Sequence, residues 1–214
     1  LACGRVCPHP CEEYCRRAIE DDEAVSINQL KRFAADHEMN SGRRLPISCA
    51  PDTGKRVAVI GGGPAGLSAA YFLRRVGHSV NIFEAMPKLG GMLRYGIPEY
   101  RLPKAVLDWE IEGILNLGIE HHTNVKMGVD FTLGSLVGAG FDAIFMGIGA
   151  WKDYKLKIPG EDLNGCFTGI NFLSKMGNNE PVEIGRRAAV IGGGNTAIDC
   201  VRTLIRMGVE KVYL

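Results

Sequence analysis

Residues 57–66 read VAVIGGGPAG, a short apolar run followed directly by a glycine-rich turn. Gly61 permits a tight turn out of a strand, and Gly63 lets backbone N–H groups approach a pyrophosphate closely. Gly66 allows the helix that follows to pack against the sheet with no side chain between them. This strand–turn–helix pattern predicts a doubly wound, Rossmann-like α/β fold that binds a dinucleotide at the turn.

The residues after the turn supply the rest of a dinucleotide site. A helix is expected from Pro64 and Ala65 to about residue 76, with its partially positive N-terminus directed at the phosphates. A second apolar run, residues 79–83, ends at Glu84. This acid lies about 20 residues beyond the turn, where the ribose hydroxyls of adenosine are expected. The combination is interpreted as a site for FAD, because an accidental glycine match would lack the strand, the helix and the acid.

A second copy of the pattern occupies residues 188–197, which read AAVIGGGNTA. One such turn holds one dinucleotide, so two turns imply that two cofactors meet. Gly192, Gly194, Asn195 and Thr196 are therefore predicted to bind a nicotinamide nucleotide, NAD(P)H. The sequence ends in the second strand of this unit, before the residue that distinguishes NAD from NADP. We expect the chain to be a fragment of a longer protein.

Composition and charge limit the partners. The chain has 214 residues, of which 46% are hydrophobic and 23% charged, enough to form the cores of two domains. A net charge of +1 argues against nucleic acid or an anionic membrane as a partner. No apolar run approaches the ~20 residues of a membrane span, and no signal peptide is visible. A cytoplasmic protein is expected.

Four of the seven cysteines fall within the first fifteen residues, as Cys3, Cys7, Cys11 and Cys15. Such clustering beside a nucleotide-binding fold indicates metal or iron–sulfur ligation before it indicates disulfides. The spacing matches neither the zinc ribbons nor the ferredoxin run, so a zinc site and simple thiols or disulfides stay as alternatives. The other three cysteines are interpreted as small apolar residues.

Three segments taken in order resemble one known family. Residues 3–8 read CGRVCP, residues 26–34 read SINQLKRFA, and residues 90–103, after the first glycine turn, read GGMLRYGIPEYRLP. The chain resembles the small subunit of glutamate synthase over essentially its whole length. The wider family includes the amino-terminal half of dihydropyrimidine dehydrogenase and the large subunit of NADH-dependent ferredoxin:NADP reductase.

The resemblance implies a role for the amino-terminal cysteines. In this family a helical segment holds two 4Fe-4S clusters with interleaved ligands. Cys7 and Cys11 would serve one cluster and Cys15 the other, whereas Cys3 matches a position that need not be a ligand. Lys31, which has no acceptor atom for iron, stands where some relatives supply a ligand other than cysteine.

The resemblance also assigns contacts to the flavin cofactor. Glu84 would bind the ribose, Gly91 and Arg101 the flavin half, and the main chain of Val125 the adenine. Residues 90–103 contain no cysteine pair like that of the disulfide reductases, so a disulfide reductase is not expected. The pyrophosphate turn would be formed by Gly61, Gly63, Pro64, Ala65 and Gly66.

Three units follow from these patterns: a helical iron–sulfur-type appendage at residues 1–50, a FAD-binding domain at 55–180, and the truncated start of an NAD(P)-binding domain at 185–214. The predicted function is a FAD-dependent oxidoreductase that passes electrons from NAD(P)H through FAD to iron–sulfur clusters and an electron-accepting subunit or domain. Hydride transfer needs no protein acid or base, so no catalytic residue is expected. The alternatives are a non-catalytic nucleotide-binding scaffold in a larger redox complex and a zinc-stabilised reductase without iron.

Overall fold

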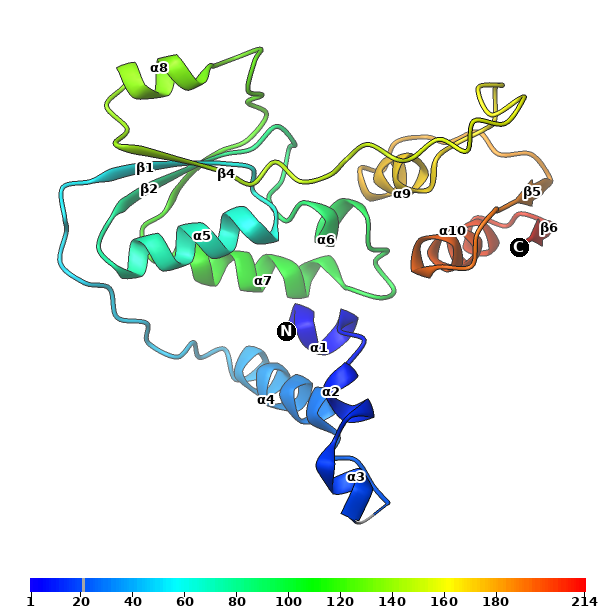
Figure 1. Ribbon diagram of the computed structural model, residues 1–214, viewed down its shortest axis with the longest axis horizontal. Coiled ribbons are helices and arrows are strands. Elements are labelled where there is room, and N and C mark those ends of the chain that lie inside the picture. Colours follow the sequence, from blue (N-terminus) through cyan, green and yellow to red (C-terminus); the bar gives the residue numbers. More distant parts are fainter. Residues whose placement is uncertain (21) are drawn as a thin grey trace.

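A computed structural model describes residues 1–20 and 22–214 of the chain. Its first part is an arm of four helices, α1 (Ala2–Val6), α2 (Pro10–Glu13), α3 (Arg16–Glu20) and α4 (Ile27–Ser41), which projects away from the sheets (Figure 1). Helix α4 ends at Gly42, which has φ +66° and so adopts the left-handed conformation that closes many helices. Ala2 of α1 shares a small core with Leu102 and Val106, which attaches the arm to the rest of the chain.

A four-stranded parallel sheet forms the centre of the larger unit (Figure 1). Its strands lie in the order β3 (Glu120–His122), β2 (Ser79–Phe83), β1 (Arg56–Ile60) and β4 (Ala143–Met146). Because neighbouring strands run parallel, each connection must cross over the sheet, and α5 (Pro64–Arg75) makes the crossover from β1 to β2. This confirms the predicted doubly wound α/β fold.

Alternating side chains of the strands supply both faces of the sheet. Val59 and Ile82, both fully buried, pack toward α5 and α7 (Lys104–Leu115), which lie side by side on one face (Figure 1). Ala58 and Ile60 pack toward the opposite face with Leu136 of α8 (Leu133–Gly138). Burying each of the valine, leucine and isoleucine side chains contributes about 1.5–3 kcal/mol. Short helix α6 (Met92–Tyr95) lies between α5 and the second unit (Figure 1).

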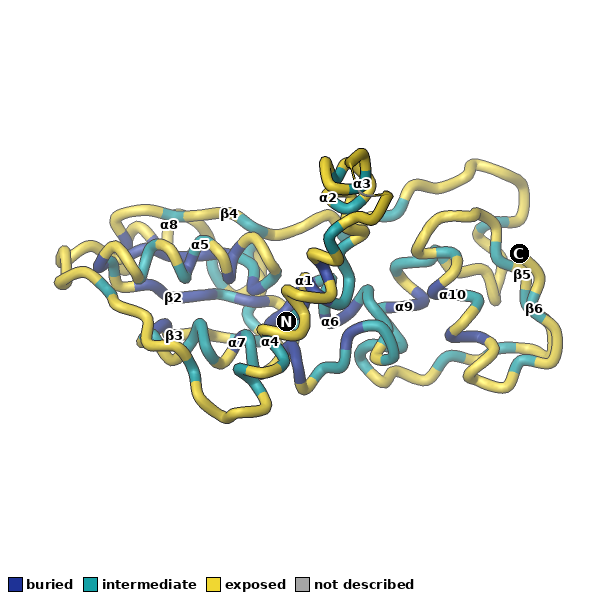
Figure 2. The backbone as a smooth tube through the Cα atoms, turned by 90° about the horizontal axis from the view of Figure 1, so that it is seen from below, coloured by how far each residue is buried: buried dark blue, intermediate teal, exposed yellow. Residues whose placement is uncertain are grey.

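A second, smaller unit follows the sheet. It consists of α9 (Gly169–Gly177), β5 (Arg187–Ala189), α10 (Asn195–Arg206) and β6 (Lys211–Tyr213), and β5 pairs with β6 in parallel. Phe172 and Leu173 of α9 form its core with Cys200 and Leu204 of α10. Figure 2 shows this second group of buried residues apart from the main one. Throughout the described ranges, no helix is both long enough and apolar enough to cross a bilayer.

Candidate functional site

The first glycine turn joins the carboxyl end of β1 to the amino end of α5. Gly63 is the N-cap of α5 and Pro64 its first residue, so no side chain covers the exposed N–H groups at this helix end. Proline fits here because its missing N–H belongs to the groups that have no partner within the helix. The helix N-terminus is therefore open to an anion, as the sequence predicts.

The space around Gly61 and Gly66 excludes any other residue. Gly61 has φ +103°, and a Cβ on it would lie 2.3 Å from the carbonyl oxygen of Gly147, just beyond β4. A Cβ on Gly66 would lie 1.8 Å from the carbonyl oxygen of Gly61. Both glycines thus permit the close approach of strand, turn and helix that a dinucleotide turn requires.

Gly91 brings the segment of residues 90–103 onto this turn. It has φ +51°, and a Cβ on it would lie 2.7 Å from the Cα of Gly63 and 3.5 Å from the Cδ of Pro64. A site residue assigned from the resemblance therefore lies directly against the turn assigned from the glycine pattern.

Glu84 also lies at the turn, at the end of β2. Its Oε2 accepts a hydrogen bond from the N–H of Gly62 at 2.6 Å, and its Oε1 accepts one from the N–H of Met86 at 2.7 Å. The residue is 6% exposed, and its own carbonyl accepts the N–H of Val125 at 3.0 Å. The structure thus brings Glu84 and Val125 together beside the turn. Each carboxylate oxygen keeps a second lone pair for a ligand hydroxyl.

Arg101, which the resemblance assigns to the flavin half, forms an ion pair with the second unit. Its Nη1 donates to Oδ2 of Asp199, in α10 of the second unit, at 2.6 Å. The hydroxyl of neighbouring Tyr100 donates to Oδ1 of the same carboxylate at 3.3 Å. Burial raises the pKa of Tyr100, and the Asp199 charge raises that pKa further.

The second glycine turn repeats the geometry of the first. Gly192 has φ +128°, Gly194 is the N-cap of α10, and Asn195 and Thr196 form the first positions of that helix. All four residues are exposed, and a Cβ on Gly194 would meet no heavy atom within 4 Å. The turn is open for a ligand phosphate to approach the helix N-terminus.

The amino-terminal cysteines carry free thiols on the helical arm. The Cys7 sulfur accepts the N–H of His9 at 3.4 Å. Backbone N–H groups of Val25 and Arg17 hold the pKa of the Cys15 thiol below its usual value. Such N–H donors favour a thiolate, the form of sulfur that binds metal. Within the described part of the chain, no three histidine, cysteine or acidic side chains converge as one metal site.

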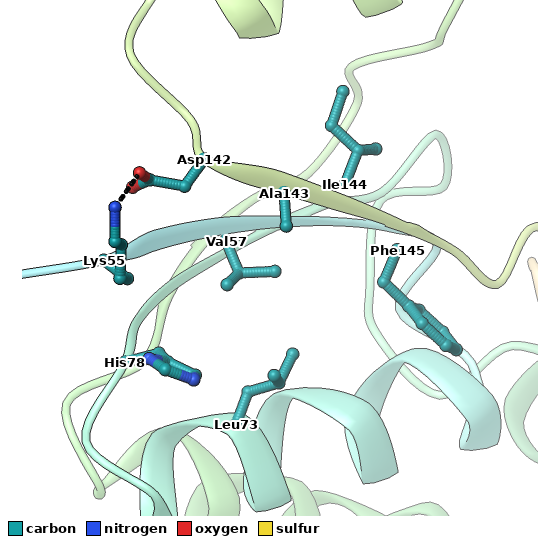
Figure 3. Close-up of a pocket in the computed structure, with 8 residues that line it drawn as sticks. All are labelled: Lys55, Val57, Leu73, His78, Asp142, Ala143, Ile144 and Phe145. Atoms are coloured by element: carbon teal, nitrogen blue, oxygen red, sulfur yellow. Dashed lines mark hydrogen bonds and ion pairs between the residues drawn. The ribbon is translucent and has the colours of Figure 1, made fainter. Parts of the chain in front are cut away.

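A hollow between α5 and the edge of the sheet lies away from both turns. Figure 3 shows it lined by Val57, Leu73 and Phe145, with the Lys55–Asp142 ion pair of 2.8 Å at its rim. Lys55 and Asp142 precede β1 and β4, so the rim lies at the amino ends of parallel strands. Ligands of such sheets bind at the carboxyl ends, where Gly63 and Gly91 meet.

Asp199, Tyr100 and Lys104 are polar contacts that the sequence did not predict. Lys104 Nζ donates to the carbonyls of Leu93 at 3.1 Å, Ile97 at 2.6 Å and Leu102 at 3.3 Å, which holds residues 93–102 in one shape. One feature of the sequence could have indicated Asp199. It is a charged residue next to Cys200 on the inner face of an amphipathic helix.

Two family profiles together match nearly the whole chain. The pyridine nucleotide-disulphide oxidoreductase family matches residues 55–214, which include both glycine turns. The chain belongs to this family. Residues 1–43 match the family described as dihydropyrimidine dehydrogenase domain II, 4Fe-4S cluster. The predicted resemblance is thereby confirmed at the level of the family.

The curated relatives that the chain matches are longer than the chain. It is 43% identical to the NADP(+)-dependent formate dehydrogenase subunit beta of Moorella thermoacetica, over 99% of this chain and 33% of the relative. It is 38% identical to the glutamate synthase [NADPH] small chain of Escherichia coli (strain K12), over 98% of this chain and 47% of the relative. The chain thus spans a third to a half of the length of these relatives.

A solved structure supports the same fold. FprA of Mycobacterium tuberculosis, determined in complex with NADPH, is 28% identical and superposes with a TM-score of 0.61. The similarity covers 72% of this chain and 36% of FprA.

Proposed function

We propose that this chain is part of a FAD-dependent oxidoreductase that takes electrons from NAD(P)H and delivers them through iron–sulfur clusters to an electron-accepting subunit or domain. The observation that carries the proposal is the first turn, where Gly61, Gly66 and Gly91 have no room for a side chain and Glu84 is buried beside them. The family and its relatives support the same reaction class.

The residues at the first turn fit a dinucleotide with an adenosine half. The free N–H groups after Gly63, at the start of α5, would bind the pyrophosphate, and the Glu84 carboxylate would accept the ribose hydroxyls. The main chain of Val125 would contact the adenine, and Gly91 and Arg101 the flavin half. Bound FAD supplies the conversion of a two-electron donor into single electrons.

The second turn fits the nicotinamide nucleotide. Gly192 and Gly194 would let its pyrophosphate reach the N–H groups of Asn195 and Thr196 at the start of α10. The residues of the two turns would orient the two nucleotides relative to each other and exclude water from the space between them. No catalytic acid or base is part of the proposal.

Cys7, Cys11 and Cys15 would hold the iron–sulfur clusters, Cys7 and Cys11 serving one and Cys15 the other. The backbone N–H groups that face the Cys7 and Cys15 sulfurs support thiolate ligands. The division into residues 1–50, 55–180 and 185–214 also stays a prediction, since α9 packs both on α10 and on α6. A cytoplasmic location belongs to the same proposal.

An anaerobic absorption spectrum of the purified protein, recorded before and after NADPH and then NADH, tests the proposal. We expect flavin bands at about 370 and 450 nm over a broad iron–sulfur absorbance, and we expect one nucleotide or both to bleach the flavin bands. Glu84→Gln should weaken FAD retention about tenfold or more. It replaces the buried carboxylate that accepts the N–H of Gly62, and that would accept the ribose hydroxyls, with a neutral amide. Glu120→Gln, at an exposed position of β3, is the matched control.

Two outcomes would favour the alternatives. A colourless protein that ignores both nucleotides would indicate a non-catalytic scaffold. A yellow protein whose metal analysis gives zinc and no iron would indicate a zinc-stabilised reductase.

A further inference from the structure

The two nucleotide units touch through one compact polar contact between Tyr100–Arg101 and α10. In Figure 1 the green loop between α6 and α7, which carries these two residues, reaches α10 of the second unit. Asp199, whose side chain is only 6% exposed, accepts the Arg101 guanidinium at 2.6 Å. A carboxylate removed from water needs a charged partner, and here that cation comes from the other unit.

Tyr100 reinforces the same contact. Its ring lies under two arginines of α10, with the Cζ of Arg206 3.8 Å and that of Arg202 4.7 Å from the ring centroid. Its hydroxyl lies 3.3 Å from Oδ1 of Asp199 and 3.4 Å from the Asp199 carbonyl oxygen. The stacking of the arginines on the ring and the hydrogen bond to the carboxylate both depend on orientation. Together they fix the direction of α10 relative to Tyr100 as well as its distance.

The segment that carries Tyr100 and Arg101 is held by internal hydrogen bonds and reaches back to the first turn. Its start, Gly91, lies against Gly63. Lys104 ties the carbonyls of Leu93, Ile97 and Leu102 together. A displacement of α10 at Asp199 would therefore be transmitted to the first turn instead of being absorbed in a flexible loop.

The second unit is attached to the first at another point as well, so the Asp199 contact affects the orientation of the second unit. Helix α9 packs on α6, where a Cβ on Gly177 would lie 3.0 Å from the Cα of Tyr95. One contact alone would leave the second unit free to rotate about it. Two separate contacts, at α9 and at Asp199, define the angle between the glycine turns.

We propose that Asp199, held by Arg101 and Tyr100, is a positioning residue that sets the second nucleotide turn relative to the first and so places the nicotinamide against the flavin. The proposal rests on the proposed function. Asp199 acts on the reaction through the orientation of α10, on the buried side of the helix, and not by touching either nucleotide.

The test is rapid anaerobic mixing of the purified holoprotein with NADPH, with flavin bleaching followed at a series of NADPH concentrations. Asp199→Asn should lower the limiting rate of bleaching at least tenfold, while FAD content and the Kd for NADPH stay within twofold of the wild type. Glu210→Gln removes an exposed ion pair with Arg186, 2.7 Å long and inside the second unit, and should leave the limiting rate unchanged.

Tyr100→Leu provides an independent variant, since it removes the stacking from the other side of the contact. It should also lower the limiting rate, and the double variant should lose no more than the more severe single one, because both remove the same contact. Should Asp199→Asn fail to fold, the Tyr100→Leu result alone decides the proposal.

Three results would overturn it. The first is a limiting rate in both variants equal to that of the wild type. The second is a raised Kd for NADPH at an unchanged limiting rate, which would make Asp199 a residue of nucleotide affinity. A wild-type protein that neither NADPH nor NADH bleaches would contradict the proposed function itself, and the positioning role with it.

Discussion

Cys200 is the residue whose chemistry the fold changes most. It lies on the inner face of α10 beside Phe172, Leu173 and Leu204, and it is 5% exposed. Burial, and after it the charge of Asp199, raises the pKa of its thiol to about 11. Since the pKa is higher in the folded state, the protonated thiol stabilises the fold below the unfolded pKa. That contribution is lost as the pH rises through about 11.

The prediction is that Cys200 resists alkylation in the folded protein. Iodoacetamide reacts with the thiolate, so at pH 8 the raised pKa and the lack of access should slow the reaction at least ~100-fold. Cys166, an exposed free thiol outside the cysteine-bearing arm, is the matched control. Mass spectrometry of timed samples measures both sites, and in urea the two should react alike. Equal rates in the folded protein would contradict the assigned burial.

At the scale of elements, the unit formed by β1, the first turn and α5 depends on contacts between backbones. Gly66 lies in the first turn of α5 and faces the carbonyl of Gly61, so a methyl group there must push the helix away from the strand. A methyl group on Gly138, in α8, would meet no heavy atom within 4 Å, and Gly138 has no positive φ. The two glycines therefore differ in packing while sharing a helical conformation.

Gly66→Ala should thus lower stability and FAD retention together. We expect a loss of about 1–3 kcal/mol in the free energy of unfolding from overpacking, with FAD released about tenfold more readily. Gly138→Ala should be neutral or stabilising by up to about 1 kcal/mol, because alanine favours a helix. Urea unfolding and the absorbance of retained FAD measure both effects. Gly66→Ala protein that keeps its FAD as well as Gly138→Ala would show that the helix tolerates the displacement.

The unit of β1, the first turn and α5 shows which structural features can be predicted from the sequence alone. Strand, turn and helix are encoded within about ten residues, so both glycine turns were predictable from local pattern. Glu84 was predictable by its spacing, but its bond to the N–H of Gly62 depends on the register of β1 and β2. Arg101 was assigned from the resemblance, and its bond to Asp199 joins residues 98 positions apart, which no local pattern encodes. The cysteine spacing left several metals open because relative placement of short helices decides ligation.

At the scale of the whole molecule, the two nucleotide units are joined by a segment that contains no helix and no strand. Residues 147–168 lie in neither helix nor strand, and Lys155, Lys157 and Tyr154 are exposed. The units are held together elsewhere, by α9 on α6 and by Arg101 on Asp199. Continuity of the chain through this segment should therefore contribute little to their association.

Limited proteolysis tests whether the contacts between the units, and not the joining segment, hold the units together. Trypsin should cut after Lys155 or Lys157 well before it cuts after Lys104, because cleavage needs several residues of extended, accessible backbone. Lys104 is the matched control, since its ammonium is bound to three carbonyls and its backbone begins α7. After the cut, the two pieces should still elute together from a gel-filtration column, because their contacts lie outside the segment. Earlier cleavage at Lys104 would contradict the first expectation, and separate elution would show that the joining segment itself holds the units in place.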